Sequence, residues 1–242
     1  MRLPCLLVTL LLVPAALSAR ERPAAPSPRT ADTPGMTAAE WRSRHDALAR
    51  RAAESNCDIL LLGDGVAEGW AATELWTTRY PRLSIVNVGI PFDTTSQLLW
   101  RLQNGGLGNL RPRLAVLMIG TSNLLDRRHD PDEVVAGIRA IVSEFQSHRP
   151  ATRLVIVTLP PVDAPPRARL RKRIRHTNEQ LAREVHDGFS VFVLDASAAL
   201  IAPDRSVLTG TIDSALHRPT SEGYRRLAET LFPELERLVG RL

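Results

Sequence analysis

The sequence predicts an α/β fold, a three-layer α/β/α sandwich built on a five-stranded parallel sheet. Two observations support this prediction. Five short, nearly continuous apolar runs recur along the chain, which is typical of parallel strands that are buried on both faces. Longer amphipathic segments separate these runs, as expected for helices that connect parallel strands. A sheet of this kind holds its ligands in a crevice beyond the carboxyl ends of the strands.

The individual elements follow from the same pattern. The predicted strands span residues 57–62 (CDILLL), 84–90 (SIVNVGI), 114–119 (LAVLMI), 154–159 (LVIVTL) and 191–194 (VFVL). The predicted helices span residues 37–55, 66–80, 94–103, 131–146, 167–186 and 222–238. The first helix carries its own start signal, since Thr37 and Glu40 form a capping box whose side chains bind free backbone N–H groups.

The N-terminal residues have the pattern of a signal peptide, which we assign to residues 1–19. Arg2 precedes an apolar stretch at residues 6–12, and Ala16-Leu17-Ser18 offers a small-x-small cleavage site. The stretch is shorter than the roughly 20 apolar residues that span a bilayer. We therefore expect export to the periplasm or medium, with no integral membrane span. Residues 20–36, rich in Pro and Ala, indicate a flexible linker, and residues 37–242 form the single folded domain.

Composition narrows the possible partners. The net charge of +5 arises from 31 basic and 26 acidic residues, and Lys172 is the single lysine. We attribute this arginine bias to genome composition and expect no nucleic-acid partner. The basic run at residues 167–175 has Leu170 and Ile174 four residues apart, so we interpret it as the solvated side of a helix. Binding of an acidic polysaccharide or lipid headgroup by this run is the alternative.

The sequence offers no pattern for a metal or a cofactor. Its histidines are scattered, without cysteine or carboxylate partners at the spacing of metal ligands. The pair Gly63 and Gly65 lacks the third glycine of a dinucleotide-binding loop, because Glu68 stands in its place. After removal of the signal peptide Cys57 would be the one cysteine, and we interpret it as a small buried residue.

Four blocks of sequence resemble the SGNH, or GDSL, hydrolases. They are ILLLGDGVAEGW (59–70), VNVGIPFDTTSQLLWRLQNG (86–105), RPRLAVLMIGTSN (111–123) and LHRPTSEGY (216–224). They are similar above all to bacterial relatives of the platelet-activating-factor acetylhydrolase catalytic subunits. The resemblance covers roughly residues 40–240 and implies a flavodoxin-like α/β/α fold and acyl-ester hydrolysis.

The resemblance assigns one chemical role to each block. The first supplies a nucleophilic Ser, the second a Gly whose N–H binds the oxyanion, and the third an Asn for the same oxyanion hole. The last supplies an Asp-x-x-His pair, the base and the carboxylate that orients it. The four replaced positions, in that order, hold Gly65, Phe92, Ser122 and Ser214. His217 matches the base position.

The replacements differ in their chemical consequence. Gly65 has no side chain, so no local rearrangement restores a nucleophile there. Phe92 retains a backbone N–H, although a positive φ at this residue would be costly. Ser122 keeps a shorter donor than Asn, and with Phe92 and Asn123 it completes the set of candidate oxyanion or ligand-binding residues.

Two carboxylates lie beside the replaced positions. Asp213 precedes the lost Asp position by one residue and could orient His217 after a local shift. Asp64 adjoins the lost nucleophile, and we interpret it as a structural group of the turn, with a role as substitute nucleophile as the alternative.

These residues favour a degenerate acylhydrolase that binds an acylated or glycan ligand, or a partner, without ordinary Ser-dependent catalysis. One alternative is an active carboxylic-ester hydrolase that uses unorthodox groups around His217, such as an activated water or a relocated Ser. A third hypothesis is a surface-interaction module that uses the basic run at residues 167–175. Assembly into a homo-oligomer stays open.

Overall fold

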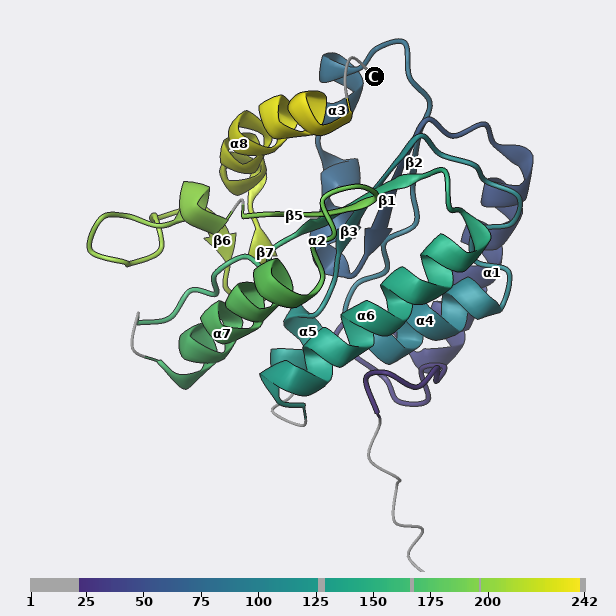
Figure 1. The fold of residues 1–242 in the computed structure, drawn as a ribbon. Coiled ribbons are helices and arrows are strands. Elements are labelled where there is room, and N and C mark those ends of the chain that lie inside the picture. The colour runs from purple at the N-terminus through teal and green to yellow at the C-terminus, as the bar shows by residue number, and fades with distance from the viewer. Residues whose placement is uncertain (1–21, 126–128, 166–167, 196, 240–242) are drawn as a thin grey trace, which may run out of the picture.

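A computed structural model describes residues 22–125, 129–165, 168–195 and 197–239. The predicted signal peptide lies outside these residues. The predicted fold is confirmed: five parallel strands form one sheet in the order β2-β1-β3-β4-β5 (Figure 1). The strands are β1 (Ile59–Gly63), β2 (Ile85–Asn87), β3 (Leu114–Met118), β4 (Arg153–Val157) and β5 (Val191–Leu194). Parallel pairing aligns Ile59 with both Ile85 and Leu114, so the carboxyl ends of the three strands meet at one edge.

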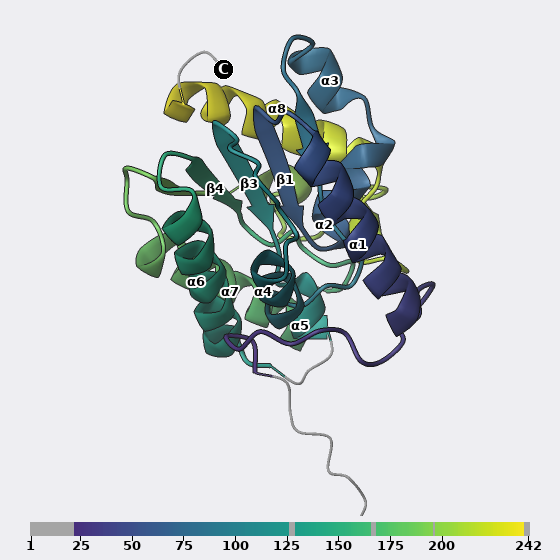
Figure 2. The same ribbon diagram turned by 90° about the vertical axis from the view of Figure 1, so that its right-hand side faces the viewer.

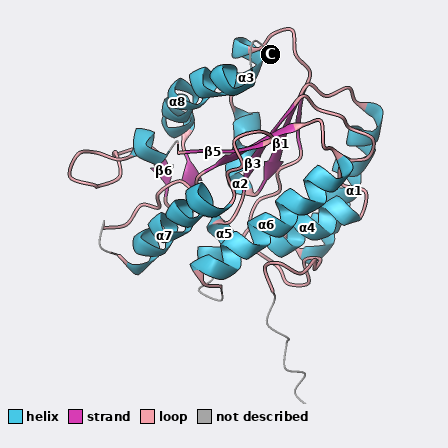
Figure 3. Cartoon of the chain, in the orientation of Figure 1, coloured by secondary structure: helices cyan, strands magenta, loops and turns pink. Residues whose placement is uncertain are grey.

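Helices cover both faces of this sheet, as Figures 2 and 3 show. One face packs against α1 (Ala38–Glu54), α4 (Thr95–Gln103), α6 (Pro131–His148) and α7 (Arg169–Glu184). The other face packs against α2 (Gly65–Gly69), α3 (Leu75–Arg79) and α8 (Ser221–Val239). Successive strand side chains point to opposite faces, so β1 sends Leu60 and Leu62 into the first core and Ile59 and Leu61 into the second. No helix among the described residues is long and apolar enough to cross a membrane.

Helix α1 begins as the sequence predicts. Thr37 accepts a hydrogen bond from the backbone N–H of Glu40, and the Glu40 carboxylate accepts one from the backbone N–H of Thr37. This reciprocal pair satisfies two of the N–H groups that a helix leaves free at its start. The helix then buries Trp41, His45 and Ala52.

The predicted helix at residues 66–80 is instead three short pieces. Helix α2 ends at Gly69, a 3-10 turn covers Trp70–Ala72, and α3 begins at Leu75. Thr73 adopts an extended backbone, and its hydroxyl donates to the carbonyl of Trp70. That local bond competes with helix continuation. A small antiparallel pair, β6 (Ile212–Asp213) and β7 (Arg218–Pro219), was also not predicted.

The described part of the segment predicted to be a linker contacts the domain. We call residues 22–36 the N-terminal strap. The carbonyl of Pro23 accepts a 3.0 Å hydrogen bond from Thr95 Oγ1, and the N–H of Ser27 donates to the carbonyl of Ser96. Arg29 is only 5% exposed. A segment without apolar periodicity is thus held by polar contacts, and the domain includes the strap.

The basic run on α7 is also less solvated than predicted. Arg171 and Arg173 are buried, and both donate to backbone carbonyls of neighbouring segments. Arg171 binds the carbonyls of Ala164 and Arg205. Buried guanidinium groups need such acceptors to offset their lost hydration, so part of the run holds loops in place.

Residue 89 sets how closely helix α2 approaches the sheet, because a Cβ added at Gly89 would lie 2.4 Å from the backbone nitrogen of Glu68. We expect Gly89→Ala to lower the free energy of unfolding by about 3 kcal/mol or more, since backbone overlap forces the elements apart. Gly65→Ala is the matched control, because a Cβ at this position would meet nothing closer than 3.7 Å. We expect this variant to change the free energy of unfolding by no more than about 1 kcal/mol. Urea unfolding measures the stability of both variants. Equal losses of stability in the two would contradict a tight contact at residue 89.

Candidate active site

A cavity of about 230 Å³ lies beyond the carboxyl ends of β1 and β3. It is lined by loops that follow three strands, by the turn between β6 and β7, and by the strap. Of the residues predicted for the site, five line this crevice: Asp64, Gly65, Phe92, Ser122 and His217. Asn123 and Ser214 are not among the lining residues. The fold therefore brings together most of the predicted positions, at the place where parallel sheets hold ligands.

Gly65, the position at which the resemblance expects a nucleophilic Ser, is the first residue of α2. Asp64 caps the helix, since its Oδ1 accepts a 2.9 Å hydrogen bond from the N–H of Val66. A side chain at Gly65 would have the Cα of Pro91 as its nearest neighbour, at 3.7 Å, an ordinary van der Waals contact. The backbone at Gly65 is also outside the left-handed region. The loop thus has room for a serine that the sequence does not supply.

Asp64 is the carboxylate beside that position, and it is 2% exposed. Burial raises the pKa of Asp64 to about 7, against the opposing effect of the N–H groups of Val66, Gly120 and Thr121. Near neutral pH this carboxyl group is therefore part protonated and part ionised. Its bond to Val66 supports the interpretation of Asp64 as a structural group of the turn.

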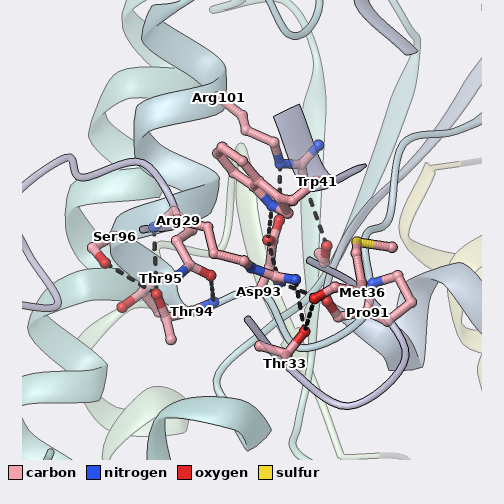
Figure 4. A network of polar contacts seen from close by, with 12 residues as sticks. Arg29, Thr33, Met36, Trp41, Pro91, Asp93, Thr94, Thr95, Ser96 and Arg101 are labelled. Carbon is pink, nitrogen blue, oxygen red and sulfur yellow. Dashed lines mark hydrogen bonds and ion pairs between the residues drawn. The ribbon is translucent and has the colours of Figure 1, made fainter. Parts of the chain in front are cut away.

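Phe92 stands where the resemblance expects glycine, and its φ is +59°, the left-handed region that glycine occupies with least strain. Its two neighbours hold it there (Figure 4). Arg29 Nη2 donates to the carbonyl of Pro91 at 2.7 Å and to Asp93 Oδ1 at 3.2 Å. The site loop is thus fixed on both sides of the strained residue.

Asp93 is the centre of that network and is fully buried. Its carboxylate accepts hydrogen bonds from Trp41 Nε1 at 2.7 Å and from Arg101 Nε at 2.8 Å, besides the bond from Arg29. Arg101 also donates to the carbonyl of Val88, the residue that follows β2. These donors come from the strap, α1 and α4, so one carboxylate joins three segments to the loop of Phe92.

The two candidates after β3 point in different directions. Ser122 lines the crevice. Asn123 is fully buried, and its Oδ1 accepts from the backbone N–H of Thr95 at 3.0 Å while its Nδ2 donates to Thr95 Oγ1 at 3.2 Å. Asn123 therefore joins helix α5 (Thr121–Leu125) to the start of α4, and Ser122 is the residue of the pair that lines the crevice.

His217 reaches the crevice without an orienting carboxylate. Its Nδ1 is buried and has no hydrogen-bond partner among the described residues. Asp213 Oδ1 instead accepts from the backbone N–H groups of Ala215 and Leu216, and Ser214 Oγ donates to Asp163 Oδ2 at 2.7 Å. A catalytic histidine needs a partner at this nitrogen to fix its tautomer and to stabilise its charged form, and neither candidate serves.

Sequence reasoning missed a charged cluster on the crevice wall. Glu68 and Arg218 both line the cavity, and Arg218 Nη1 donates to Glu68 Oε2 at 2.5 Å. Arg44 Nη2 binds the other carboxylate oxygen at 3.2 Å. Their positions in the sequence could have indicated these two residues, since Glu68 is one helical turn after Gly65 and Arg218 follows His217. Within the described ranges no group of three or more His, Cys, Asp or Glu is placed to hold a metal ion.

Comparison with known proteins agrees with this geometry. The model of the GDSL-like lipase/acylhydrolase family matches residues 61–226. Human platelet-activating factor acetylhydrolase IB subunit alpha2 is 28% identical over 199 residues, which are 82% of this chain and 85% of the relative. A GDSL-like lipase from Bacteroides thetaiotaomicron superposes with a TM-score of 0.64 at 16% identity, covering 80% of this chain and 97% of the other. A mutant acetylxylan esterase from Geobacillus stearothermophilus superposes with a TM-score of 0.58 at 18% identity, covering 77% of this chain and 95% of the other.

The left-handed backbone of Phe92 gives a stability test. At most positions glycine is less stable than alanine by roughly 0.5–1 kcal/mol, but at a positive φ the order reverses. We expect Phe92→Gly to be more stable than Phe92→Ala by about 1 kcal/mol. Chemical unfolding of the two variants measures the difference. If Phe92→Ala were as stable as Phe92→Gly, or more stable, the loop would have relaxed out of the left-handed conformation.

The raised pKa of Asp64 gives a pH test with a defined sign. The folded state holds a proton up to about pH 7, whereas the unfolded group releases it near its ordinary value of 3.8. The stability that the Asp64 proton contributes is fully present below the pKa of the unfolded state, and it is lost as pH rises through the pKa of the folded state. Relative to Asp64→Asn, which does not titrate, the parent should gain about 1.4 kcal/mol when pH falls from 6 to 5. A constant difference in unfolding free energy over this range would contradict the burial effect.

Proposed function

Because the chain belongs to the GDSL-like lipase/acylhydrolase family, we propose that its crevice binds a small acylated ligand and does not hydrolyse it by Ser-dependent catalysis. One observation carries this proposal. Helix α2 begins with Gly65 at the family's nucleophile position, in a loop that has room for a side chain. Removal of a nucleophilic serine from an intact triad costs on the order of 10⁶ in kcat, and here the remaining partners are incomplete as well.

The chemistry of the crevice suits an acyl group. Apolar side chains of Val66, Phe92 and Leu125 line it together with the hydroxyl of Ser122 and the ring of His217. Small-molecule sites combine an apolar lining with a few placed polar groups in this way, typically in 300–1,000 Å³. The volume of about 230 Å³ lies below that range, which suits a small group. The names of the acetylhydrolase and acetylxylan esterase relatives support an acetyl or other short acyl group, carried by a lipid or a glycan.

A second candidate function is ester hydrolysis by a water that His217 activates. The retention of His217 in the crevice favours it. The Nδ1 of His217 counts against it, since no described residue hydrogen-bonds this nitrogen to stabilise the imidazolium that a general base forms. The interaction module on α7 is less favoured, because Arg171 and Arg173 are buried in the domain.

Hydrolysis of 4-nitrophenyl acetate, with calorimetric binding of ethyl acetate and ethyl butyrate, tests the proposal. We expect the parent protein and His217→Ala to bind an ester and to show equal, background turnover. Gly65→Ser should hydrolyse the activated ester at least about 10³-fold more slowly than a family member with an intact triad, because the base lacks its orienting carboxylate. Gly65→Ala is the control that adds a side chain without a hydroxyl.

Two results would overturn the proposal, and they differ in meaning. Turnover by the parent that His217→Ala abolishes would establish the second candidate function instead. Absence of ester binding, with the protein folded, would exclude the crevice as an acyl site.

A further inference from the structure

We propose that the tip of the N-terminal strap, residues 34–36, sets the size of the group that the crevice accepts, and that Arg29 is the positioning residue that seats this tip. The identity of that group as an acyl chain rests on the proposed function. The role of the strap as a wall rests on contacts of its own.

The tip is a tight turn with little freedom. Thr33 and Met36 exchange two backbone hydrogen bonds, of 2.9 and 3.1 Å. Pro34 and Gly35 occupy the two central positions, and Gly35 has a φ of +75°. Proline followed by a glycine of positive φ is the preferred sequence of a type II turn. The turn therefore presents a defined surface where Pro34, Gly35 and Met36 line the crevice.

Arg29 links this turn to the site loop. Its Nη1 donates to Thr33 Oγ1 at 3.0 Å, and its Nη2 donates to the carbonyl of Pro91 and to Asp93 (Figure 4). The side chains of Arg29 and Asp93 are 1% and 0% exposed. A buried guanidinium is costly without its acceptors, so Arg29 holds the strap at one place relative to Phe92.

The strap adds a wall that the parallel sheet does not supply. The other walls come from sheet-end loops and from the turn after β6, through residues such as Phe92, Leu125 and Leu216. Met36 is half-buried at the crevice, and its unbranched side chain fills space that alanine would leave open. Shortening Met36, or releasing Arg29, should therefore admit longer groups.

A thiol placed in the crevice measures this access without any ligand or catalysis. Gly65→Cys introduces it where a Cβ meets only ordinary contacts. Alkyl methanethiosulfonates with methyl, butyl and octyl chains then label it: the thiolate attacks the sulfur that bears the alkyl chain, a disulfide forms and methanesulfinate leaves. The full chain with its native Gly65 gives the background from its own two cysteines, Cys5 and Cys57. Burial raises the pKa of Cys57 to about 11, so this thiol reacts slowly.

We expect the ratio of the octyl to the methyl labelling rate to rise at least tenfold when Met36→Ala is added to Gly65→Cys. Met36→Leu, which conserves volume, should leave the ratio unchanged. Arg29→Met should raise the ratio as well, whereas Arg22→Met, at an exposed residue of the same strap, should not. Circular dichroism establishes that each variant is folded.

Ratios within twofold of the parent value in folded Met36→Ala would overturn the proposal, whatever Arg29→Met does. If Arg29→Met does not fold, Met36→Ala decides the matter. Failure of the proposed function is distinguishable, because it would abolish ester binding and leave the dependence of labelling on chain length intact.

Discussion

The buried carboxylate of Asp93 is the interaction on which the arrangement of the site depends. An isolated carboxylate at this depth would be several kcal/mol unfavourable, and its stability here comes from three donors on three segments: Arg29, Trp41 and Arg101. Each donor is tied to a different part of the chain. The strap, α1 and α4 therefore have one relative position in which the carboxylate is satisfied, and that position also fixes the loop of Phe92.

This constraint also explains why the framework of the crevice does not depend on the positions that the family resemblance associates with catalysis. The contacts that build the crevice run through Asp93, the cap on α2 and the bond between Asn123 and Thr95. None of them requires a hydroxyl at position 65 or a carboxylate beside His217. The contacts that build the crevice thus lie on other residues than Gly65 and His217, so side-chain changes at those two positions would leave the crevice in place.

Much of the fold could be predicted from the sequence, because burial of parallel strands and helix capping leave local patterns. The five apolar runs and the capping box at Thr37 are such patterns. The strap could not be predicted, because its packing depends on an ion pair between Arg29 and Asp93, 64 residues apart, in a segment without apolar periodicity. The break after α2 depends on one side-chain bond of Thr73, which the amphipathic pattern does not reveal.

The location of the candidate site could be predicted from the sequence, but the directions of some of its side chains could not. Resemblance of whole blocks located the crevice, since position in a strand-end loop follows from the fold. It could not tell that Asn123 turns inward or that Ser214 turns towards Asp163. Those directions depend on neighbours that are distant in sequence, and a motif carries no information about them.

The anchoring of the strap also bears on the order in which the molecule forms. The strap is made before the segments it contacts, and Arg29 can bind Pro91 and Asp93 only once their loop is in place. Closing so long a loop has an entropic cost. We therefore expect the sheet and its helices to assemble first and the strap to dock onto them last. A segment held by few polar contacts is also among the first to open as stability falls, so the crevice would lose one wall well before the domain unfolds.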